Sequence, residues 1–333
     1  MQRWFEENTG HEAIGVAEGD LETVGTISTE YDGQVIENKR FTGSVNVNHD
    51  NVTIRGCRFE PSSSSHHGRI RDPAPNLTVE YCTWEMPEGN GSHSIQVSNN
   101  APGLLVRYNK WTEDNYGGTF LRVNQGSGTE QNPIRVEYNY MAHRDWDTSR
   151  PTGIGLRANA PGYTEWWEIR RNWVGGYENF NIYNRDPNDV ANADHPGIRH
   201  IVIEENLLVH PDRSSGRSGD DVESNFYNRT GGSRNVSWDS LNRSDTSGPY
   251  HDLKFNNNKF SRWSYPAGGY DRVAIQISPH LHGDETNEFE GNVMLPAPGW
   301  PGLEPVINGQ VDFGNRQDWT YDSSQVNAWS YEG

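Results

Sequence analysis

Five acidic residues could supply the carboxylates that glycoside chemistry requires. They are Asp145 and Asp147 in HRDWD (143–147), Asp220 and Asp221 in SGDDV (218–222), and Glu178. Glycosidases use two carboxylates about 5–5.5 Å apart for retention or about 6.5–9.5 Å apart for inversion, so these residues are the catalytic candidates. Asp145, Asp147 and Glu178 are also candidate Ca²⁺ ligands through their oxygens, without a recognised loop motif. Chance carboxylate pairs are expected in a chain with 46 acidic residues.

A second set of polar residues recurs at alternate positions of short, strand-like segments. Arginine presents a planar fork to carboxylates, amides reach hydroxyl groups, and aromatic rings pack on sugar faces, so this column suits an extended glycan. The candidate glycan-binding residues are Arg71, Arg122, Asn124, Arg157, Asn159, Tyr183, Tyr227 and Arg229. The same strand phase contains Arg69, Gln96, Ser98, Asn181 and Gln276. For any single residue, a solvated strand face is the simpler explanation.

Both sets depend on a nine-residue unit that recurs along the chain. Its fourth and ninth positions are apolar, and its seventh is Cys57 or Cys82 in the first two units and then asparagine. Apolar residues that alternate with polar ones predict strands. The recurring asparagine predicts a turn, and stacked copies predict an asparagine ladder. The eight units begin at residues 51, 76, 103, 133, 166, 200, 252 and 286.

Each unit is followed by a second short strand, and the intervals are too short for a crossover helix. The 52-residue interval between the units at 200 and 252 predicts a degenerate coil near NVSWDSLNR (235–243). The following strands include SIQVSN (94–99), FLRVNQ (120–125) and NFYNR (225–229). Such units bury their apolar faces only by stacking on one another.

The units resemble the coil repeat of the pectin-lyase-like superfamily over roughly residues 35–310. The resemblance implies an all-β, single-stranded, right-handed parallel β-helix, a solenoid of about nine or ten coils with N- and C-terminal caps. The expected division is an N-terminal cap at 1–34, the parallel β-helix at 35–295, and a C-terminal cap with an aromatic tail at 296–333. Trp4, Phe5, Ile14, Val16 and Leu21 could supply apolar contacts for the first cap.

This superfamily contains lyases, hydrolases, phage tailspikes and adhesins, so the fold alone does not give the function. The segment SGDDV is similar to the Gly-Asp-Asp segment of polygalacturonases, but the chain lacks the Gly-His-Gly and Arg-Ile-Lys sequences of that family. Residues 35–59 are similar to the opening coils of phage-associated and secreted β-helix proteins. We therefore expect a virion-associated spike, fibre or decoration protein that recognises a host-surface glycan. One alternative is a polysaccharide lyase or glycoside hydrolase acting on an acidic polysaccharide, and another is a purely structural β-helix spacer.

Cys57 and Cys82 occupy the same position in consecutive units, so their Cα atoms should lie about 4.8 Å apart. Stacked parallel Cβ atoms stay about that far apart too, which is beyond the ~3.8 Å that a disulfide favours. We therefore expect two inward-facing thiols that pack as small apolar groups.

Composition and charge restrict the partners. The 12 Trp, 15 Tyr and 10 Phe exclude a disordered chain. The 28 basic and 46 acidic residues give a net charge of -18, so nucleic-acid binding, which needs a basic surface, is not expected. No stretch has the ~20 apolar residues of a membrane helix, and no membrane insertion is expected.

The N-terminus lacks the layout of a secretion signal, which fits either a removed signal or release of a virion by lysis. The expected location is therefore the virion or the extracellular space. The expected partners are a host-surface polysaccharide or glycoprotein and other virion proteins. The chain is expected to form a homotrimer without a cofactor, apart from the Ca²⁺ considered above.

The acidic surface also predicts a response to salt. Lysine is nearly absent, with only Lys39, Lys110, Lys254 and Lys259, which is typical of proteins from halophiles, although an ordinary acidic protein is the alternative. Repulsion between carboxylates should destabilise the fold at low ionic strength, and salt should screen it. Thermal melting is therefore expected at higher temperature in molar KCl than in low salt. A melting temperature that falls or stays constant would contradict the halophilic interpretation.

Overall fold

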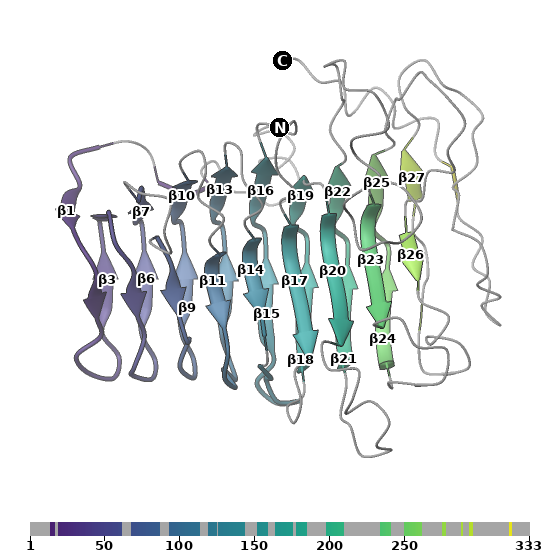
Figure 1. The fold of residues 1–333 in the computed structure, drawn as a ribbon, viewed down its shortest axis with the longest axis horizontal. Helices are drawn as coiled ribbons and strands as arrows, with labels where there is room; N and C mark the ends of the chain where they lie inside the picture. The colour runs from purple at the N-terminus through teal and green to yellow at the C-terminus, as the bar shows by residue number, and fades with distance from the viewer. Residues whose placement is uncertain are drawn as a thin grey trace.

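The described part of the chain consists of β-strands and contains no helix. The computed structural model describes residues 14–16, 19–61, 68–86, 93–113, 119–124, 126–143, 152–158, 164–175, 178–184, 198–209, 234–240, 250–261, 275–277, 288, 293–295 and 320–321. Their strands form three parallel sheets of 11, 9 and 8 strands, here named sheets A, B and C (Figure 1).

Each sheet is built from strands that are widely separated in the sequence. Sheet A contains β1 (Glu22–Val24), β4 (Lys39–Phe41), β7 (Arg58–Phe59), β10 (Thr83–Met86), β13 (Lys110–Glu113), β16 (Tyr140–His143), β19 (Trp173–Gly175), β22 (Leu207–Val209), β25 (Lys259–Ser261), β27 (Val293–Leu295) and β28 (Thr320–Tyr321). Sheet B contains β2 (Ile27–Ser28), β5 (Val45–Asn46), β8 (Ile70–Arg71), β11 (His93–Val97), β14 (Thr119–Val123), β17 (Thr152–Ala158), β20 (Glu178–Asn184), β23 (Arg234–Ser240) and β26 (Ile275–Ile277). Sheet C contains β3 (Val35–Glu37), β6 (Thr53–Arg55), β9 (Thr78–Glu80), β12 (Leu105–Arg107), β15 (Ile134–Glu137), β18 (Thr164–Arg170), β21 (Ile198–Glu204) and β24 (Tyr250–Asn256).

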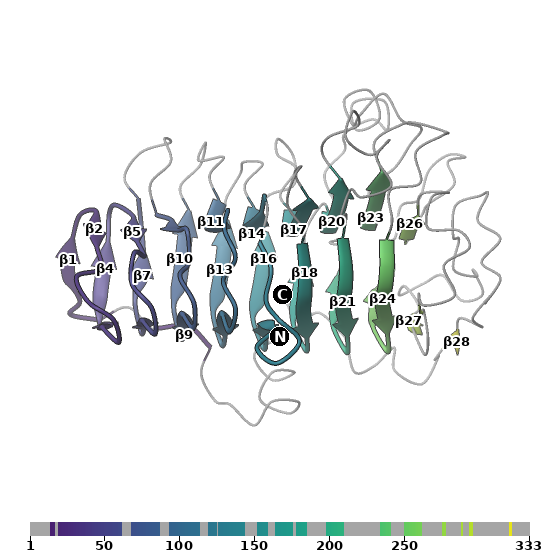
Figure 2. The ribbon, with the colours of Figure 1, turned by 90° about the horizontal axis from the view of Figure 1, so that it is seen from below.

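The chain visits the three sheets in turn. A strand of sheet C is followed by one of sheet A and then one of sheet B, and each strand from β1 to β23 pairs in parallel with the strand three places further along. Successive passes therefore lie side by side along the long axis of the molecule (Figures 1 and 2). Such stacking is the arrangement expected of a parallel β-solenoid. Each pass is called a coil below.

The apolar columns expected from the repeat are confirmed. Residues at the fourth position pair in register across sheet C, as Ile54 does with Val79, and are buried. Residues at the ninth position pair in register across sheet A, and the stacked rings of Phe41, Phe59 and Trp84 begin this column, with centroids 5.0 and 4.6 Å apart. Burying each large apolar side chain contributes roughly 1.5–3 kcal/mol, so these columns hold the coils together.

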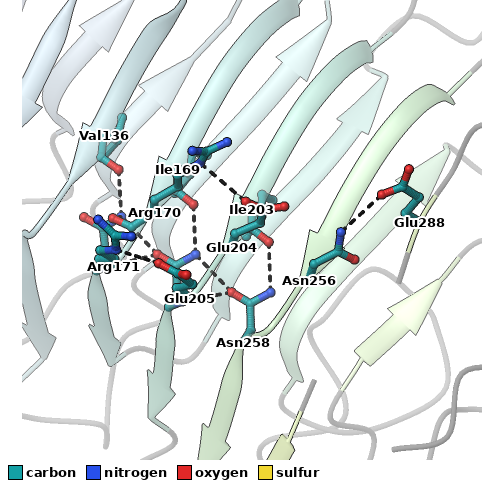
Figure 3. A network of polar contacts seen from close by, with 12 residues as sticks. Val136, Ile169, Arg170, Arg171, Ile203, Glu204, Glu205, Asn256, Asn258 and Glu288 are labelled. Carbon is teal, nitrogen blue, oxygen red and sulfur yellow. Dashed lines mark hydrogen bonds and ion pairs between the residues drawn. The ribbon is translucent and has the colours of Figure 1, made fainter. Parts of the chain in front are cut away.

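The expected asparagine ladder is also confirmed. It lies at the corner where the chain passes from sheet C to sheet A (Figure 3), and its members are Asn109, Asn139, Asn172, Asn206 and Asn258, all buried. The first four Nδ2 atoms each donate to the Oδ1 of the next asparagine at 2.9–3.0 Å. All five also donate to a backbone carbonyl of the preceding coil at 2.8–2.9 Å.

The sharp backbone turn precedes the asparagine, which differs from the expected position. The sixth residue of the unit has the left-handed conformation, with φ of 54–58°, in Gly56, Tyr81, Tyr108, Tyr138, Arg171, Glu205 and Asn257. The asparagine that follows acts through its side chain, because its amide reaches backbone groups that the bend leaves without sheet partners. The first position of most units is left-handed too, as at Asn51 and Trp166.

Two further assignments are corrected by the structure. A unit at residues 33–41 carries the same two left-handed positions, at Gly33 and Asn38, and supplies β3 and β4. The segment expected to form a degenerate coil near 235–243 instead overlaps β23, which pairs with β20 in sheet B. The sequence predicts NFYNR (225–229) as the strand that follows β20 in sheet B, but that segment lies outside the described residues.

The N-terminal segment runs along sheet A. The Gly15 N–H donates to the Tyr108 carbonyl at 2.9 Å, and the Val16 carbonyl accepts from Thr83 Oγ1 at 3.1 Å. A Cβ atom on Gly15 would lie 2.4 Å from Thr83 Oγ1, so this close approach requires glycine. Leu21 leads into β1, the first strand of sheet A. Trp4 and Phe5 of the expected cap, and nearly all of 296–333, lie outside the described residues.

The asparagine ladder predicts a large effect of a small substitution. Asn139→Ala should lower the free energy of unfolding by roughly 2–4 kcal/mol, because it leaves the buried Asn109 N–H without its acceptor and removes the side-chain hydrogen bond to the Val106 carbonyl. Urea unfolding measures this change. As the control, Asn48→Ala alters an exposed side chain and should change stability by less than about 0.5 kcal/mol. A loss below about 1 kcal/mol for Asn139→Ala would contradict the role assigned to the ladder.

Candidate functional site

The outer face of sheet B carries the expected column of polar residues. The inward phase of its strands is apolar, and Ile95, Leu121, Ile154 and Phe180 are buried. The side chains at the alternate, outward positions are partly exposed in Arg71, Gln96 and Arg122. Backbone pairing places one column in register through Ser28, Asn46, Arg71, Gln96, Arg122, Gly155, Asn181, Ser237 and Gln276.

Arg157 belongs to a neighbouring column. Gly155 pairs with Arg122, while Arg157 pairs with Tyr183, and Tyr183 pairs with Asp239. Because Val123 pairs with Leu156, Asn124 lies level with Arg157. The two arginines are thus offset by two residues, and the place expected for Tyr227 is taken by Asp239.

Several candidate side chains are not described. The strands place Arg157 and Tyr183 by backbone alone, and Asn159, Tyr227 and Arg229 lie outside the described residues. The described part of the column is therefore Arg71, Gln96, Arg122 and Asn124, together with the neighbouring Arg69.

Hydrogen bonds to uncharged partners hold these side chains in place. Arg122 donates from Nε to Asn124 Oδ1 at 3.0 Å and from Nη1 to His93 Nε2 at 2.7 Å. Arg69 donates from Nη1 to Gln96 Oε1 at 3.2 Å, and Gln96 Nε2 donates to Ser98 Oγ at 3.2 Å. Since a guanidinium only donates, His93 accepts at Nε2 and is neutral in this arrangement.

Two arginines of this face, Arg69 and Arg122, have neutral hydrogen-bond partners. Within the described chain, neither Arg69 nor Arg122 forms an ion pair, and only 8% of Arg69 is exposed. The pKa of the Arg69 guanidinium is lowered, first because burial penalises its charged form and then because the charge of Arg71 lies nearby. Its Nε atom is buried and has no hydrogen-bond partner among the described residues. Arg69 and Arg122 thus have no carboxylate partner among the described residues, in a protein with a net charge of -18.

Arginines on the other two faces are mostly paired with acids. Sheet A contains the pair Arg58–Glu60 at 2.6 Å. Sheet C and its corners carry five such pairs at 2.5–3.5 Å, formed by Arg55–Glu37, Arg107–Glu80, Arg170–Glu204, Arg171–Glu205 and Arg199–Glu165. Two of them are drawn in Figure 3. Arg135, which is exposed, is the one arginine on the described part of sheet C without an ion pair.

A ladder of tyrosines beside sheet C was not anticipated. The rings of Tyr81, Tyr108 and Tyr138 stack in sequence with centroids 5.1 and 5.3 Å apart. Arg171 follows them, 5.7 Å from the centre of the Tyr138 ring, and donates to its hydroxyl at 2.7 Å. That bond and the bond to Glu205 raise the pKa of Arg171. These residues all occupy the sixth position of the unit, so the repeat contained the signal.

A second unanticipated cluster occupies the first position of three consecutive units. Trp166 and His200 stack with centroids 4.0 Å apart, and His200 Nδ1 lies 2.8 Å from Asp252 Oδ2. All three residues have left-handed backbone, with φ of 51–59°. His200 thus contacts both Trp166 and Asp252, and we assign this cluster a structural role at the corner before sheet C.

The side chains of the catalytic candidates are not among those that the structure describes. Asp145, Asp147, Asp220 and Asp221 lie outside the described residues. Glu178 begins β20, where its backbone pairs with Thr152 and Arg234, and its side chain is not described. The search for three or more His, Cys, Asp or Glu residues able to hold a metal ion found none in the described part of the chain.

Comparison with known proteins does not extend these observations. No protein-family model, curated protein or solved structure matches the chain. The described residues include no helix with the length and apolar character needed to span a membrane.

The two cysteines are free and completely buried. Burial raises the pKa of the Cys82 thiol well above its usual range, whereas the hydrogen bond with Cys82 lowers the pKa of Cys57. Only a thiolate attacks a disulfide reagent, and complete burial keeps the reagent from reaching either sulfur. Ellman's reagent at pH 8 should therefore not modify the folded protein, and both thiols should react after denaturation in guanidinium chloride. Absorbance at the thionitrobenzoate band measures the reaction. Rapid labelling of the folded protein would show that the coils containing Cys57 and Cys82 open.

Proposed function

We propose that the outer face of sheet B binds an acidic glycan, and that the chain is a right-handed parallel β-helix of about nine or ten coils with a capped C-terminal end. The right hand follows the strong preference of parallel crossover connections. The observation that carries the binding proposal is the set of arginines with neutral partners, Arg69 and Arg122, in a strongly acidic protein.

A glycan with carboxylate or sulfate groups suits this arrangement chemically. Charge-assisted hydrogen bonds to an arginine fork are about twice as strong as neutral ones. An anion beside Arg69 and Arg71 would offset the repulsion that lowers the pKa of Arg69. Gln96 lies between Arg71 and Arg122 in register and offers an amide to hydroxyl groups.

The geometry also favours a polymer over a small ligand. Coils are spaced about 4.8 Å apart, so Arg71 and Arg122 lie roughly 10 Å apart along the solenoid axis. A polymer aligned with that axis could engage both, and weak contacts at successive coils would add. A homotrimer would present three such faces.

The similarity of residues 35–59 to phage-associated opening coils supports a virion-associated protein that recognises a polysaccharide or glycoprotein of a host surface. This role requires no cofactor. A lyase or hydrolase on the same fold remains the alternative, with the acidic residues named above as its catalytic candidates.

Substitution of Arg71 and Arg122 together by alanine should weaken binding to a polyuronate at least tenfold, because each lost charged hydrogen bond costs about 1.5–3 kcal/mol. Binding is measured by isothermal titration calorimetry at low salt. The control is Arg135→Ala, which removes one positive charge from sheet C and is matched to the single variant Arg122→Ala; it should leave the affinity within about twofold of the original.

Equal weakening by the control variant, or unchanged binding by the double variant, would contradict the assignment to sheet B. Shortened or unsaturated polyuronate after incubation with the protein, abolished by Asp145→Asn or Asp221→Asn, would establish the enzymatic alternative instead.

A further inference from the structure

The N-terminal end of the solenoid presents three open sheet edges. The first strands of sheets A, B and C are β1, β2 and β3, and each pairs on one side only within the described chain. They lie together at the purple end of the molecule (Figure 1). Unpaired edge strands are templates for pairing with another chain.

The hydrogen bonds of β3 identify which backbone groups face outward. The Thr53 N–H donates to the Gln34 carbonyl at 2.9 Å, and Thr53 is in register with Val35. In a parallel pair this geometry turns the N–H and carbonyl of Val35 away from β6. The same argument applies to Ser28 of β2, since its neighbour Ile27 donates to the Ser44 carbonyl at 2.9 Å.

Apolar side chains are exposed at this end and nowhere else in the described chain. Tyr31 and Val35 are the large hydrophobic residues classed as exposed there, at 57% and 50%. Both belong to the first coil, and Val35 lies on the edge strand itself. An exposed apolar residue on an unpaired strand indicates a surface that another strand covers.

Charge indicates what kind of strand that is. Residues 19–38 contain five carboxylates, Asp20, Glu22, Glu30, Asp32 and Glu37, and no lysine, arginine or histidine. Glu22 and Glu37 form ion pairs with Lys39 and Arg55, whereas Asp20, Glu30 and Asp32 form none within the described chain. Two copies of the chain meeting at these ends would bring like charges together, which is unfavourable. The described part of the N-terminal segment does not cover the end either, because Gly15 and Val16 contact Tyr108 and Thr83 several coils away.

We infer that the open edge of β3 docks an extended, basic segment of another protein, which adds to sheet C as the next strand. On β3 the outward side chains are Val35 and Glu37, with Ile36 buried between them. A matching strand places an apolar residue over Val35 and a lysine or arginine over Glu37. Main-chain hydrogen bonds then supply affinity, and the alternating side chains supply specificity.

The test uses the full chain and two fluorescein-labelled peptides of eight residues. One, the valine–lysine peptide, repeats Val-Thr-Lys-Thr, so that valine and lysine alternate on its outward face, and the other repeats Val-Pro-Lys-Pro, so that the charge is equal but half of the N–H donors are missing. Fluorescence anisotropy should show at least tenfold tighter binding of the first peptide. Equal affinities would overturn the inference, because attraction to the acidic surface alone would explain them.

A protein variant locates the site. Val35→Pro removes only an N–H that faces away from β6, so proline is tolerated at this edge position, and the melting temperature should stay within a few degrees. Binding of the valine–lysine peptide should weaken at least tenfold, while the control Val35→Ile should keep it within about twofold. Unchanged binding by Val35→Pro would overturn the inference. So would sedimentation showing that the protein alone dimerises and that Val35→Pro abolishes the dimer, because the occupant would then be a second copy.

Discussion

The corner between sheets C and A is the constraint on which the rest of the solenoid depends. A parallel strand that bends there carries N–H and carbonyl groups past the end of one sheet before the next sheet can pair them, and burial makes unpaired groups costly. The left-handed residue makes the bend, and the asparagine that follows supplies the missing hydrogen bonds, as Asn139 does for the Val106 carbonyl and the Asn109 N–H. The coils from Asn109 to Asn258 repeat this solution, whereas Lys39, Cys57 and Cys82 stand at the same position in the three coils before them.

The fold was predictable from the sequence because the constraint recurs. Residues such as Val106 and Asn139 occupy identical places in each unit, so their columns follow from spacing alone. The unit at 33–41 escaped detection because Lys39 stands where asparagine or cysteine was expected. The left-handed residue was misplaced by one position since tyrosine and arginine carry no signal for that conformation in sequence.

The candidate site was less predictable than the fold. Alternation identified the outward phase of sheet B, but register depends on loop lengths, and loops between strands differ from coil to coil. Arg157 was therefore expected level with Arg122, whereas Gly155 takes that place. What distinguishes the three faces is the pairing of charges, with Arg107 bonded to Glu80 on sheet C and Arg122 bonded to neutral groups on sheet B. Spacing alone does not reveal which arginines find carboxylates.

The asparagine ladder also gives the solenoid an electrical direction. In each of its first four amides one N–H points toward the next coil, and the oxygens of the asparagines that follow accept from the previous coil, from Asn109 to Asn258. The amide dipoles are thus aligned head to tail in a low-dielectric interior, where neighbouring hydrogen bonds polarise and strengthen one another. The array is partially negative at Asn109 and partially positive at Asn258. An interruption at its centre would divide it into two short arrays, whereas the loss of a terminal member would leave one long array intact.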